Sequence, residues 1–526
     1  METIKPNEAS PADAGSGAAS EAGPSRRELL VQGSKVAAGI GVAALLGNLS
    51  NWALSYAAST RTEKKNWLIS GDCRYTAYLW RTGDVMNTKA DRGRYLYIQT
   101  NDIREGQNAV LGYSRKDDGT LEPLPSNPFY TGGTGINNNT HGKLGPHDND
   151  TPLVISQDGA RLFTVNTHSN TIAVFDIQPD GSLRHVKGSP FFSQGVAPNS
   201  LSVNDNTLLV SNRNEDYHQI EALRGAAKAR YVSFTIGDDG ALQLVSKIDV
   251  ENSQKPTQVF IPASNPHLAF GNDFQVDVDF DGEGTRSFLA GTKPSVQGQL
   301  HVFQVGHDSR LTERSLVQLP ETNAGYKYKG MDGVPSMPLG IWTHPTEPLL
   351  YVGFVTRNEL GVYRFSREGA TTFLGSVTNS GQDICWVLPN KKGTRLYTVN
   401  NLPRSDKDDK AATVSTYDIS GERAVKPVEI SRLQLPHPGK WFINNRVFPQ
   451  PGSTAFQCAL NPEDTFLYVI CQRINQTDEN ESEEGNILHS LRLNGEGLPS
   501  VAQSRHLGQD GVHYRSRPQG VATVDR

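Results

Sequence analysis

One five-residue phrase recurs along the chain and constrains its fold more than any other feature. Each copy begins with leucine and continues with mostly β-forming residues, and most copies end in a polar side chain. A strand-like segment precedes every copy except the first, and a third and a fourth β-rich segment follow most of them. The seven copies begin at Leu96, Leu162, Leu208, Leu268, Leu350, Leu396 and Leu467.

Units of four short strands, repeated at intervals of very roughly 45 to 80 residues, are typical of the blades of a β-propeller. From the first copy onward the chain alternates short β-rich runs with Gly, Asn and Asp turns, and it has no long amphipathic helical pattern. The sequence therefore predicts an all-β fold, a seven-bladed β-propeller of four-stranded blades.

A ring of blades must close, and the two ends of the repeat suggest how. The copy at Leu96 lacks the preceding strand that the other copies possess, whereas the C-terminal segment from Gln519 to Val524 resembles such a strand. We expect this segment to form the innermost strand of the first blade, because the ring is then closed without an open sheet edge.

The N-terminus predicts a twin-arginine signal peptide. Arg26 and Arg27 precede a mild apolar run, from Val36 to Leu46, and small residues around Ala57 suit a signal-peptidase site. The run has roughly 11 residues, against about 20 needed to cross a bilayer as a helix, so we expect no permanent membrane anchor. The alternative is a short amphipathic helix preceded by a disordered tail.

Three segments are therefore expected: a signal peptide at 1–57, an N-terminal arm at 58–93 that is too aromatic for a plain linker, and the propeller at 94–526. Export by the twin-arginine route predicts a periplasmic or secreted protein.

Composition and missing motifs exclude several classes of function. The formal net charge is −5, charged residues make up 20% of the chain and no long basic run occurs, so no nucleic-acid partner is expected. Four scattered cysteines without a Cys-x-x-Cys pair argue against a disulfide scaffold and against a zinc site. Serine-hydrolase elbows, His-Glu-x-x-His motifs and phosphate-binding loops are absent, and no dinucleotide fingerprint lies in a strand-to-helix setting.

No organic cofactor is evident, and a divalent cation is the one cofactor that the sequence leaves open. The stretch from Asp277 to Gly282 has the alternating acids and the turn glycine of a calcium loop, but the closing acid is replaced by Phe288. The same alternation is typical of a β-strand with one acidic face, which is the favoured interpretation.

Candidate site residues lie where the strands end, since propeller ligands bind at one mouth of the central channel. The polar ends of the repeated phrase include the stretches from Asn166 to His168 and from Asn212 to Asp216. A hydrolytic site needs a base that activates water and a cation that holds the developing oxyanion. The predicted catalytic set is His147 as base, Arg213 and Arg473 as anion holders, and Glu215 or Asp273 to orient the histidine. The alternative for each residue is a structural one, the capping of a turn or a hydrogen bond to a neighbouring loop.

Three stretches, Leu153 to Asn166, Gly188 to Phe191 and Gly381 to Val387, resemble the lactonase-like seven-bladed propellers. This family includes bacterial 6-phosphogluconolactonases and fungal carboxymuconate-cyclising enzymes, and the resemblance runs from Tyr95 to the C-terminus. It implies a propeller fold and a lactonase type of activity. The sugar-lactonase branch carries a Gly-Pro-Arg-His phrase, but the matching stretch here, Met337 to Gly340, lacks the Arg and the His. The Glu that follows in that branch falls near Val355.

The leading functional prediction is an extracytoplasmic lactonase-like hydrolase that opens a small cyclic ester at the channel mouth. The absent Arg, His and Glu, together with export, indicate a substrate other than a phosphorylated sugar lactone. Two alternatives stay open: a non-catalytic propeller that binds a ligand or a protein partner, and a ring-opening or ring-forming lyase or isomerase of the muconate-cyclising type.

Overall fold

The computed structural model describes residues 93–136, 151–214, 216, 227–250, 255–274, 298–322, 336–402, 411–437, 441–443, 446–448, 452–473 and 485–526. The chain divides into two compact units, Met1–Met86 and Asn87–Arg526, and all described residues belong to the second. The predicted signal peptide and almost all of the predicted arm therefore lie outside the described residues. Among those that are described, no helix is long and apolar enough to cross a membrane.

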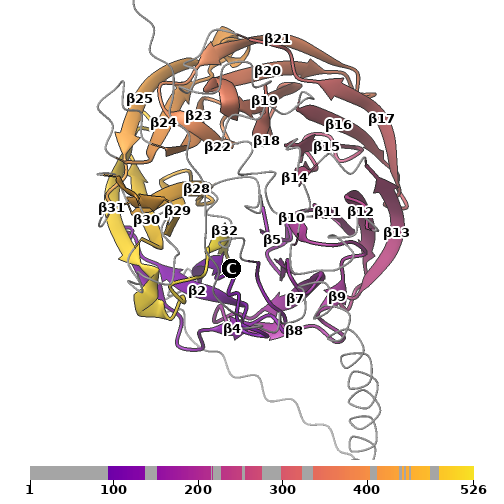
Figure 1. Cartoon of the computed structure of the whole chain (residues 1–526), viewed down its shortest axis with the longest axis vertical. Helices are drawn as coiled ribbons and strands as arrows, with labels where there is room; N and C mark the ends of the chain where they lie inside the picture. Colours follow the sequence, from indigo (N-terminus) through magenta and orange to yellow (C-terminus); the bar gives the residue numbers. More distant parts are fainter. Residues whose placement is uncertain are drawn as a thin grey trace, which may run out of the picture. The chain divides into compact units, whose positions relative to one another are not determined.

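The second unit is a ring of seven antiparallel sheets, as the repeat predicts (Figure 1). From the innermost strand outward, blade 1 contains β32 (Gln519–Asp525), β1 (Arg94–Gln99), β2 (Ala109–Arg115) and β3 (Leu121–Pro123). Blade 2 contains β5 (Leu153–Ile155), β6 (Arg161–Asn166), β7 (Thr171–Ile177) and β8 (Leu183–His185). The short strands β4 (Phe129–Tyr130) and β9 (Phe191–Phe192) pair with β2 and β7.

The remaining blades follow the chain without exchange of strands. Blade 3 contains β10 (Pro198–Asn204), β11 (Thr207–Asn212), β12 (Arg230–Ile236) and β13 (Leu242–Asp249). Blade 4 contains β14 (Pro256–Phe260), β15 (Leu268–Asp273), β16 (Gln299–Val305) and β17 (Leu311–Gln318). Blade 5 contains β18 (Pro338–Thr343), β19 (Leu349–Phe354), β20 (Glu359–Phe365) and β21 (Thr371–Thr378).

Blade 6 contains β22 (Gln382–Pro389), β23 (Arg395–Leu402), β24 (Thr413–Asp418) and β25 (Val428–Gln434). Blade 7 contains β28 (Ser453–Leu460), β29 (Phe466–Arg473), β30 (Ile487–Leu493) and β31 (Pro499–His506). A hairpin of β26 (Trp441–Ile443) and β27 (Arg446–Phe448) lies between these two blades in sequence, and the short 3-10 helices are η2 (Val355–Arg357), η4 (Gly421–Ala424) and η5 (Leu507–Asp510).

The predicted closure of the ring is confirmed. The C-terminal strand β32 pairs antiparallel with β1, so that Tyr95 lies opposite Val524 and Ile98 opposite Val521. In Figure 1 the yellow C-terminal strand accordingly lies beside the indigo strands of blade 1. An ion pair between the buried Arg115 and the half-buried Asp525 also spans the junction. The last residues therefore complete the first blade and remove its open edge.

The hydrophobic core lies in the seams between neighbouring blades. The second strand of each blade is almost wholly buried, because it is covered by one neighbouring blade on each face. In the seam between blades 1 and 2, for example, Tyr97 packs with Leu162 and Phe175. The residues of the outermost strands are mostly half-buried or exposed, as in strands with one solvated face.

The antiparallel order gives the ring two chemically different faces. The second strand of each blade ends on one face, where the second-to-third connections and the connections between blades lie; we call it the loop face. The first-to-second and third-to-fourth connections lie on the opposite face, which we call the turn face. Every internal segment outside the described residues is flanked by described residues that lie on the loop face. The loop face is thus the face on which the chain varies in length between blades.

Candidate functional site

Buried polar side chains gather where the second strands reach the loop face. Gln99, Asn166, Asn212, Asn400 and Gln472 all lie at or near such strand ends and are at most 1% exposed. Buried polar groups cost free energy unless they are hydrogen-bonded, so a belt of them at one face is expected to order the connecting loops or to bind a ligand.

The predicted residues that the structure describes, Arg213, Asp273 and Arg473, all lie on this loop face. His147 and Glu215 fall outside the described residues, in the connections that follow β4 and β11. The roles assigned to these two residues therefore stay predictions.

The clearest arrangement for proton transfer is a histidine–aspartate pair that bridges blades 2 and 3. His168 follows β6 and Asp216 follows β11, and His168 Nδ1 lies 2.7 Å from Asp216 Oδ2. The Asp216 side chain has no exposed surface, whereas that of His168 is 38% exposed. The hydrogen bond to Asp216 raises the pKa of His168 although partial burial opposes it.

This geometry is that of an oriented general base. A buried carboxylate on Nδ1 fixes the tautomer and the plane of the imidazole, and a half-exposed ring can accept a proton from water or substrate. Both residues belong to the polar strand ends that the repeat singled out. The predicted catalytic set did not include the pair, because sequence does not show that the ends of two different blades meet.

Hydrogen bonds hold the loops around the pair together and place two buried cations there. Thr167 Oγ1 donates to the carbonyl of Pro198 at 2.8 Å, which links blade 2 to blade 3. Lys255 Nζ donates to the carbonyl of Asn214 at 3.4 Å, which links blade 3 to blade 4. Lys255 is 1% exposed and Arg213 is 2% exposed. Positive charge thus lies in the same group of loops as Asp216.

Asp273, one of the two residues predicted to orient a catalytic histidine, is engaged inside the ring. Its Oδ1 accepts a hydrogen bond from the hydroxyl of Tyr231 at 2.8 Å, and its Oδ2 lies 2.5 Å from Nε2 of His301 on β16. Nδ1 of His301 lies 2.6 Å from Oε1 of Glu313 on β17. Asp273 does orient a histidine, but this histidine is 2% exposed and acts as a bridge within blade 4.

Arg473 lies on the loop face of blade 7, apart from Arg213 on blade 3. Its guanidinium lies 5.7 Å from the ring centre of Tyr514, and Nη1 donates to the Tyr514 carbonyl at 3.3 Å. Burial lowers the pKa of Arg473 to about 10. Blades 4, 5 and 6 separate the two arginines on one side of the ring, and blades 1 and 2 on the other. The structure therefore places both on the predicted face but not on adjacent blades.

Asp383 is a further acidic residue on this face, and it is not among the site residues predicted from the sequence. Asp383 lies on β22, the innermost strand of blade 6, with a left-handed backbone φ of 57°. Its amide donates to Asn358 Oδ1 at 2.8 Å, and burial raises the pKa of its carboxyl group to about 7. A carboxyl group that titrates near neutrality can exchange protons under physiological conditions. In the sequence, the stretch from Gly381 to Val387 carries only the resemblance to the lactonase-like propellers.

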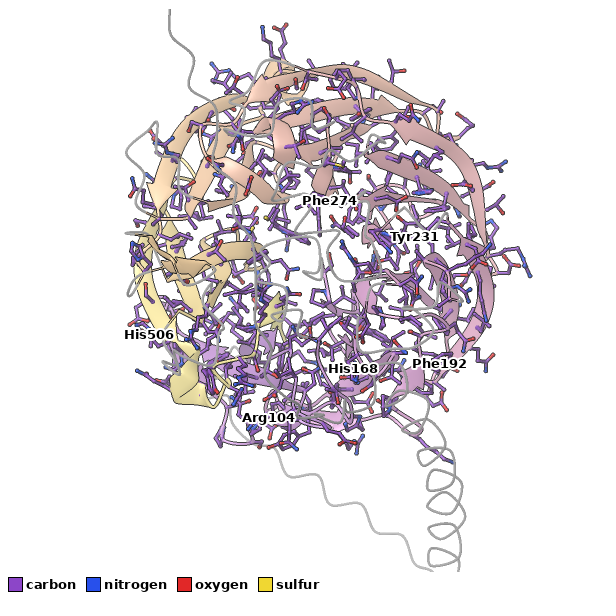
Figure 2. The ribbon with its side chains drawn as sticks, in the orientation of Figure 1. Arg104, His168, Phe192, Tyr231, Phe274 and His506 are labelled. Atoms are coloured by element: carbon purple, nitrogen blue, oxygen red, sulfur yellow. The ribbon has the colours of Figure 1, made fainter. Side chains whose placement is uncertain are left out.

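Apolar side chains from blades 4 to 7 meet on the inner side of the loop face. Phe274, Val355, Cys385 and Phe456 belong to one buried cluster with Met337 and Leu339. Figure 2 shows Phe274 toward the middle of the ring and His168 in the part formed by blade 2. The loop face therefore has a polar, charged portion at blades 2 to 4 and an apolar portion at blades 4 to 7.

Within the described parts of the chain, no three His, Cys, Asp or Glu side chains lie close enough to hold a metal ion. The stretch from Asp277 to Gly282, which the sequence left open as a cation loop, is not among the described residues.

Comparison with known proteins identifies the fold. A candidate 6-phosphogluconolactonase from Bacteroides uniformis superposes with a TM-score of 0.54 at 14% identity, over 82% of this chain and 100% of its own. A second one, from Bacteroides fragilis, has a TM-score of 0.53 at 15% identity, over 84% and 100%. A hypothetical selenium-binding protein from Sulfolobus tokodaii has the same TM-score of 0.53 at 11% identity, over 84% and 96%. No protein-family model and no curated protein sequence matches the chain.

Identities this low show a shared fold and nothing finer, since proteins with quite different names reach the same score. The resemblance stated from the sequence is confirmed at the level of architecture. By its fold, the chain is a seven-bladed β-propeller, and it shares this fold with the two candidate 6-phosphogluconolactonases.

Proposed function

We propose that this protein is a hydrolase that opens a small cyclic ester on the loop face, with His168 as the general base and Asp216 as the residue that orients it. The observation that carries the proposal is the 2.7 Å contact between a half-exposed imidazole and a fully buried carboxylate. Lactone hydrolysis is also the activity in the names of two proteins with the same fold.

The reaction requires one proton to be moved twice. His168 takes a proton from water as the oxygen attacks the carbonyl carbon, and negative charge develops on the carbonyl oxygen. When the ring C–O bond breaks, the imidazolium returns the proton to the leaving alkoxide, and the product is a hydroxy acid. Asp216 stabilises the imidazolium between these two steps, because its carboxylate lies directly against Nδ1.

Positive charge near the pair supports this chemistry. Arg213 and Lys255 are buried in the loops that hold Asp216, where a cation stabilises an oxyanion more strongly than in water. The carboxylate of the product is attracted by the same charges. These two residues are the proposed anion-stabilising groups, and Arg213 keeps the role that the sequence predicted for it.

The substrate is proposed to be an unphosphorylated lactone. The Arg, His and Glu of the sugar-lactonase branch are missing at Met337 to Gly340 and near Val355, and these positions contribute to an apolar cluster here. An apolar cluster in place of these charged side chains offers no partner for a phosphate group.

The proposal includes export to the periplasm or the medium by the twin-arginine route. Replacement of Arg26 and Arg27 by lysine should retain the full-length protein in the cytoplasm of a bacterial host, as fractionation and immunoblotting would show. An unchanged distribution would overturn this part of the proposal and leave the chemistry untouched.

A lactone panel tests the activity. We expect turnover of at least one uncharged lactone, followed by acid release at constant pH, and a fall in kcat of about 10²- to 10⁴-fold in His168→Gln. The matched control is His185→Gln, because His185 is an exposed residue of the same blade on the outermost strand β8.

Three results would overturn the proposal. Equal turnover by His168→Gln would remove the assigned base. Tight binding of a panel member without turnover would identify a binding propeller. Formation or opening of a ring without uptake of water would identify a lyase or isomerase.

A further inference from the structure

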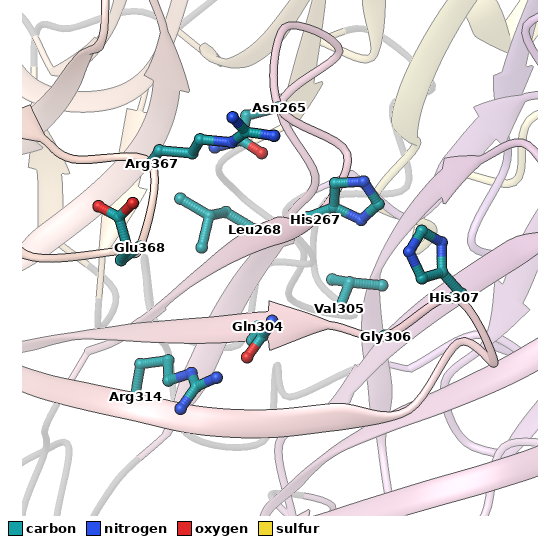
Figure 3. Close-up of a pocket in the computed structure, with 10 residues that line it drawn as sticks. All are labelled: Asn265, His267, Leu268, Gln304, Val305, Gly306, His307, Arg314, Arg367 and Glu368. Carbon is teal, nitrogen blue, oxygen red and sulfur yellow. The ribbon is translucent and has the colours of Figure 1, made fainter.

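A pocket of about 580 Å³ lies in the seam between blades 4 and 5, on the turn face and therefore on the opposite side of the ring from the His168–Asp216 pair (Figure 3). Leu268 and Val305 form its apolar wall, and His267, His307, Arg314 and Arg367 are among its polar residues. Its volume falls within the range of small-molecule sites, roughly 300 to 1,000 Å³.

The other six seams differ from this one in their hydrogen bonds. In each of them a side chain of one blade forms a hydrogen bond with the third-to-fourth connection of the next blade and so joins the two blades. Tyr97 Oη, for example, donates to the carbonyl of Gly181 at 2.8 Å, and Arg161 Nη1 donates to that of Gly237 at 3.2 Å.

At the second-strand positions of these donors blade 4 carries Leu268 and Phe270, and the third-strand donor Arg492 corresponds to Gln304. Leu268 pairs with Gln304 on the third strand, just as Arg161 pairs with Asp176 in blade 2. By this pairing Leu268 takes the place of Arg161, one position earlier than the leucines that begin the other copies of the repeated phrase. In the described structure, no hydrogen bond joins blade 4 to the turn that starts at Ser366. This seam thus lacks the side-chain hydrogen bond that joins neighbouring blades in the equivalent seams.

The turn of blade 5 also differs in charge from its equivalents. In six blades the third and fourth strands are joined by the same five-residue turn. The amide of its first residue donates to the carbonyl of its fifth residue, and the amide of its fourth residue donates to the carbonyl of its first residue. The second position of this turn is Asp117 in blade 1 and Asp238 in blade 3, but Arg367 in blade 5 and His307 in blade 4. The repeat therefore places imidazole and guanidinium at this pocket where blades 1 and 3 have carboxylates and blades 2 and 7 have Pro179 and Gly495.

Both walls of the pocket are fixed. The turn of blade 5 is closed by a hydrogen bond from Gly369 N to Ser366 O at 3.1 Å. Gly369 has φ of 94°, and a Cβ there would lie 3.0 Å from Val302 Cγ1, so the turn packs directly on blade 4. On the other wall, the hydroxyls of Ser309 and Thr207 lie 2.7 Å apart and tie the blade 4 turn to blade 3. These bonds fix the backbone of the two turns, whereas the side chains of His307, Arg314, Arg367 and Glu368 are exposed.

The charges in the pocket define what it can hold. In Figure 3, Arg367 and Arg314 lie on opposite sides of Leu268, and Glu368 is on the blade 5 side. Neither arginine has an ion pair or a hydrogen bond with another described residue. Two unneutralised guanidinium groups favour two carboxylates, and guanidinium binds a carboxylate through two parallel hydrogen bonds. Glu368 and Gln304 add partners for hydroxyl groups.

We propose that this pocket is a ligand site, separate from the loop face, for a small hydroxylated dicarboxylate. Arg314 and Arg367 each bind one carboxylate, and Gln304 and Glu368 accept hydrogen bonds from the hydroxyl groups between them.

Three four-carbon probes separate the contributions: tartrate, which has two carboxylates and two hydroxyls, succinate, which lacks the hydroxyls, and erythritol, which lacks the carboxylates. In thermal unfolding of the purified full-length protein, tartrate at about ten times its Kd should raise the midpoint by about 1 to 2 °C. Succinate should act more weakly, and erythritol should have no effect. Isothermal titration gives the Kd values.

The repeat itself supplies the variants. Leu268→Arg introduces the residue that blade 2 has at this position and should fill the pocket and abolish tartrate binding. Arg367→Asp introduces the residue of blades 1 and 3 and should weaken tartrate binding about tenfold or more. The matched control is Arg364→Gln, since Arg364 is exposed on β20 of the same blade and does not line the pocket.

The proposal is overturned if neither tartrate nor succinate binds to the wild-type protein, if erythritol stabilises it as much as tartrate, or if Arg367→Asp and Leu268→Arg bind tartrate as the wild type does. The last result would mean that dicarboxylates act elsewhere on the surface. Lactone turnover has no part in these measurements, so the two proposals can fail separately.

Discussion

Replacement of His301 by glutamine tests whether a buried, positively charged histidine between two carboxylates stabilises blade 4. His301 is 2% exposed and lies between Asp273 and Glu313, 2.5 and 2.6 Å from their carboxylate oxygens. Burial alone lowers the pKa of His301, but the two adjacent carboxylates outweigh it and raise the pKa to about 9. The histidine is therefore expected to be a cation throughout the physiological pH range.

The pH dependence of the stability that His301 contributes follows from its pKa values in the folded and the unfolded chain. Because the pKa is higher in the folded than in the unfolded chain, the contribution is fully present below pH 6.5 and is lost as the pH rises through 9. The difference between about 9 and 6.5, at about 1.4 kcal/mol per pKa unit, corresponds to about 3 kcal/mol. For a unit of roughly 440 residues this is a change of about 3 °C in the unfolding midpoint.

Thermal unfolding followed by circular dichroism at about pH 6 and about pH 10 provides the assay. The variant should be less stable than the wild type at the lower pH, because Asp273 then lacks its cation inside the protein. The difference between the unfolding midpoints of the wild type and the variant should be about 3 °C smaller at the higher pH than at the lower pH. His185→Gln is the control, since His185 is exposed on blade 2. A gap of the same size at both pH values would refute the assignment of the charge to His301.

Three further predictions concern ring closure and the catalytic pair. Deletion of residues 519–526 removes six positions paired with β1, at about 1 kcal/mol per backbone hydrogen bond, so thermal unfolding should show a midpoint lower by about 7 °C or more. An unchanged midpoint would contradict closure by β32. Burial and the hydrogen bond with Glu463 raise the pKa of Asp525 to about 6, so the stability that this group contributes is present below pH 3.8 and is lost as the pH rises through about 6. Asp525→Asn should therefore raise the midpoint at neutral pH but not near pH 4, and a variant less stable than the wild type at neutral pH would count against this. Asp216 raises the pKa of His168, so kcat/KM should decrease at acid pH with an apparent pKa above 6.5. In Asp216→Asn this decrease should occur at lower pH. A decrease at the same pH would show that another group titrates.

The architecture was predictable because propeller blades are local structures. Each blade consists of consecutive strands, so its hydrophobic alternation and its turns are present within a short stretch of sequence. Closure was predictable for a related reason: the copy at Leu96 lacks a first strand and the C-terminus offers one. In blade 4, however, strand pairing places Leu268 one position earlier than the repeated phrase suggested, because pairing with Gln304, not the leucine, sets the register.

The candidate site was predictable only in part. Polar residues at strand ends indicated the loop face, and Arg213, Asp273 and Arg473 do lie there. Which of them meet could not be inferred, since contacts between ends depend on how neighbouring blades pack. His301 illustrates the limit: a single histidine in an ordinary strand gives no signal, yet it is the partner of Asp273.

The sequence by itself therefore determined the number of blades, their strand order, the closing strand and the face that carries the polar ends, because each of these follows from short-range pattern. Only the tertiary structure decided that His168 meets Asp216, that Asp273 is held by His301, and that the seam beside Leu268 stays open. Each of these depends on side chains from two strands or two blades, and their distances are fixed by packing across a sheet or a seam rather than by spacing along the chain.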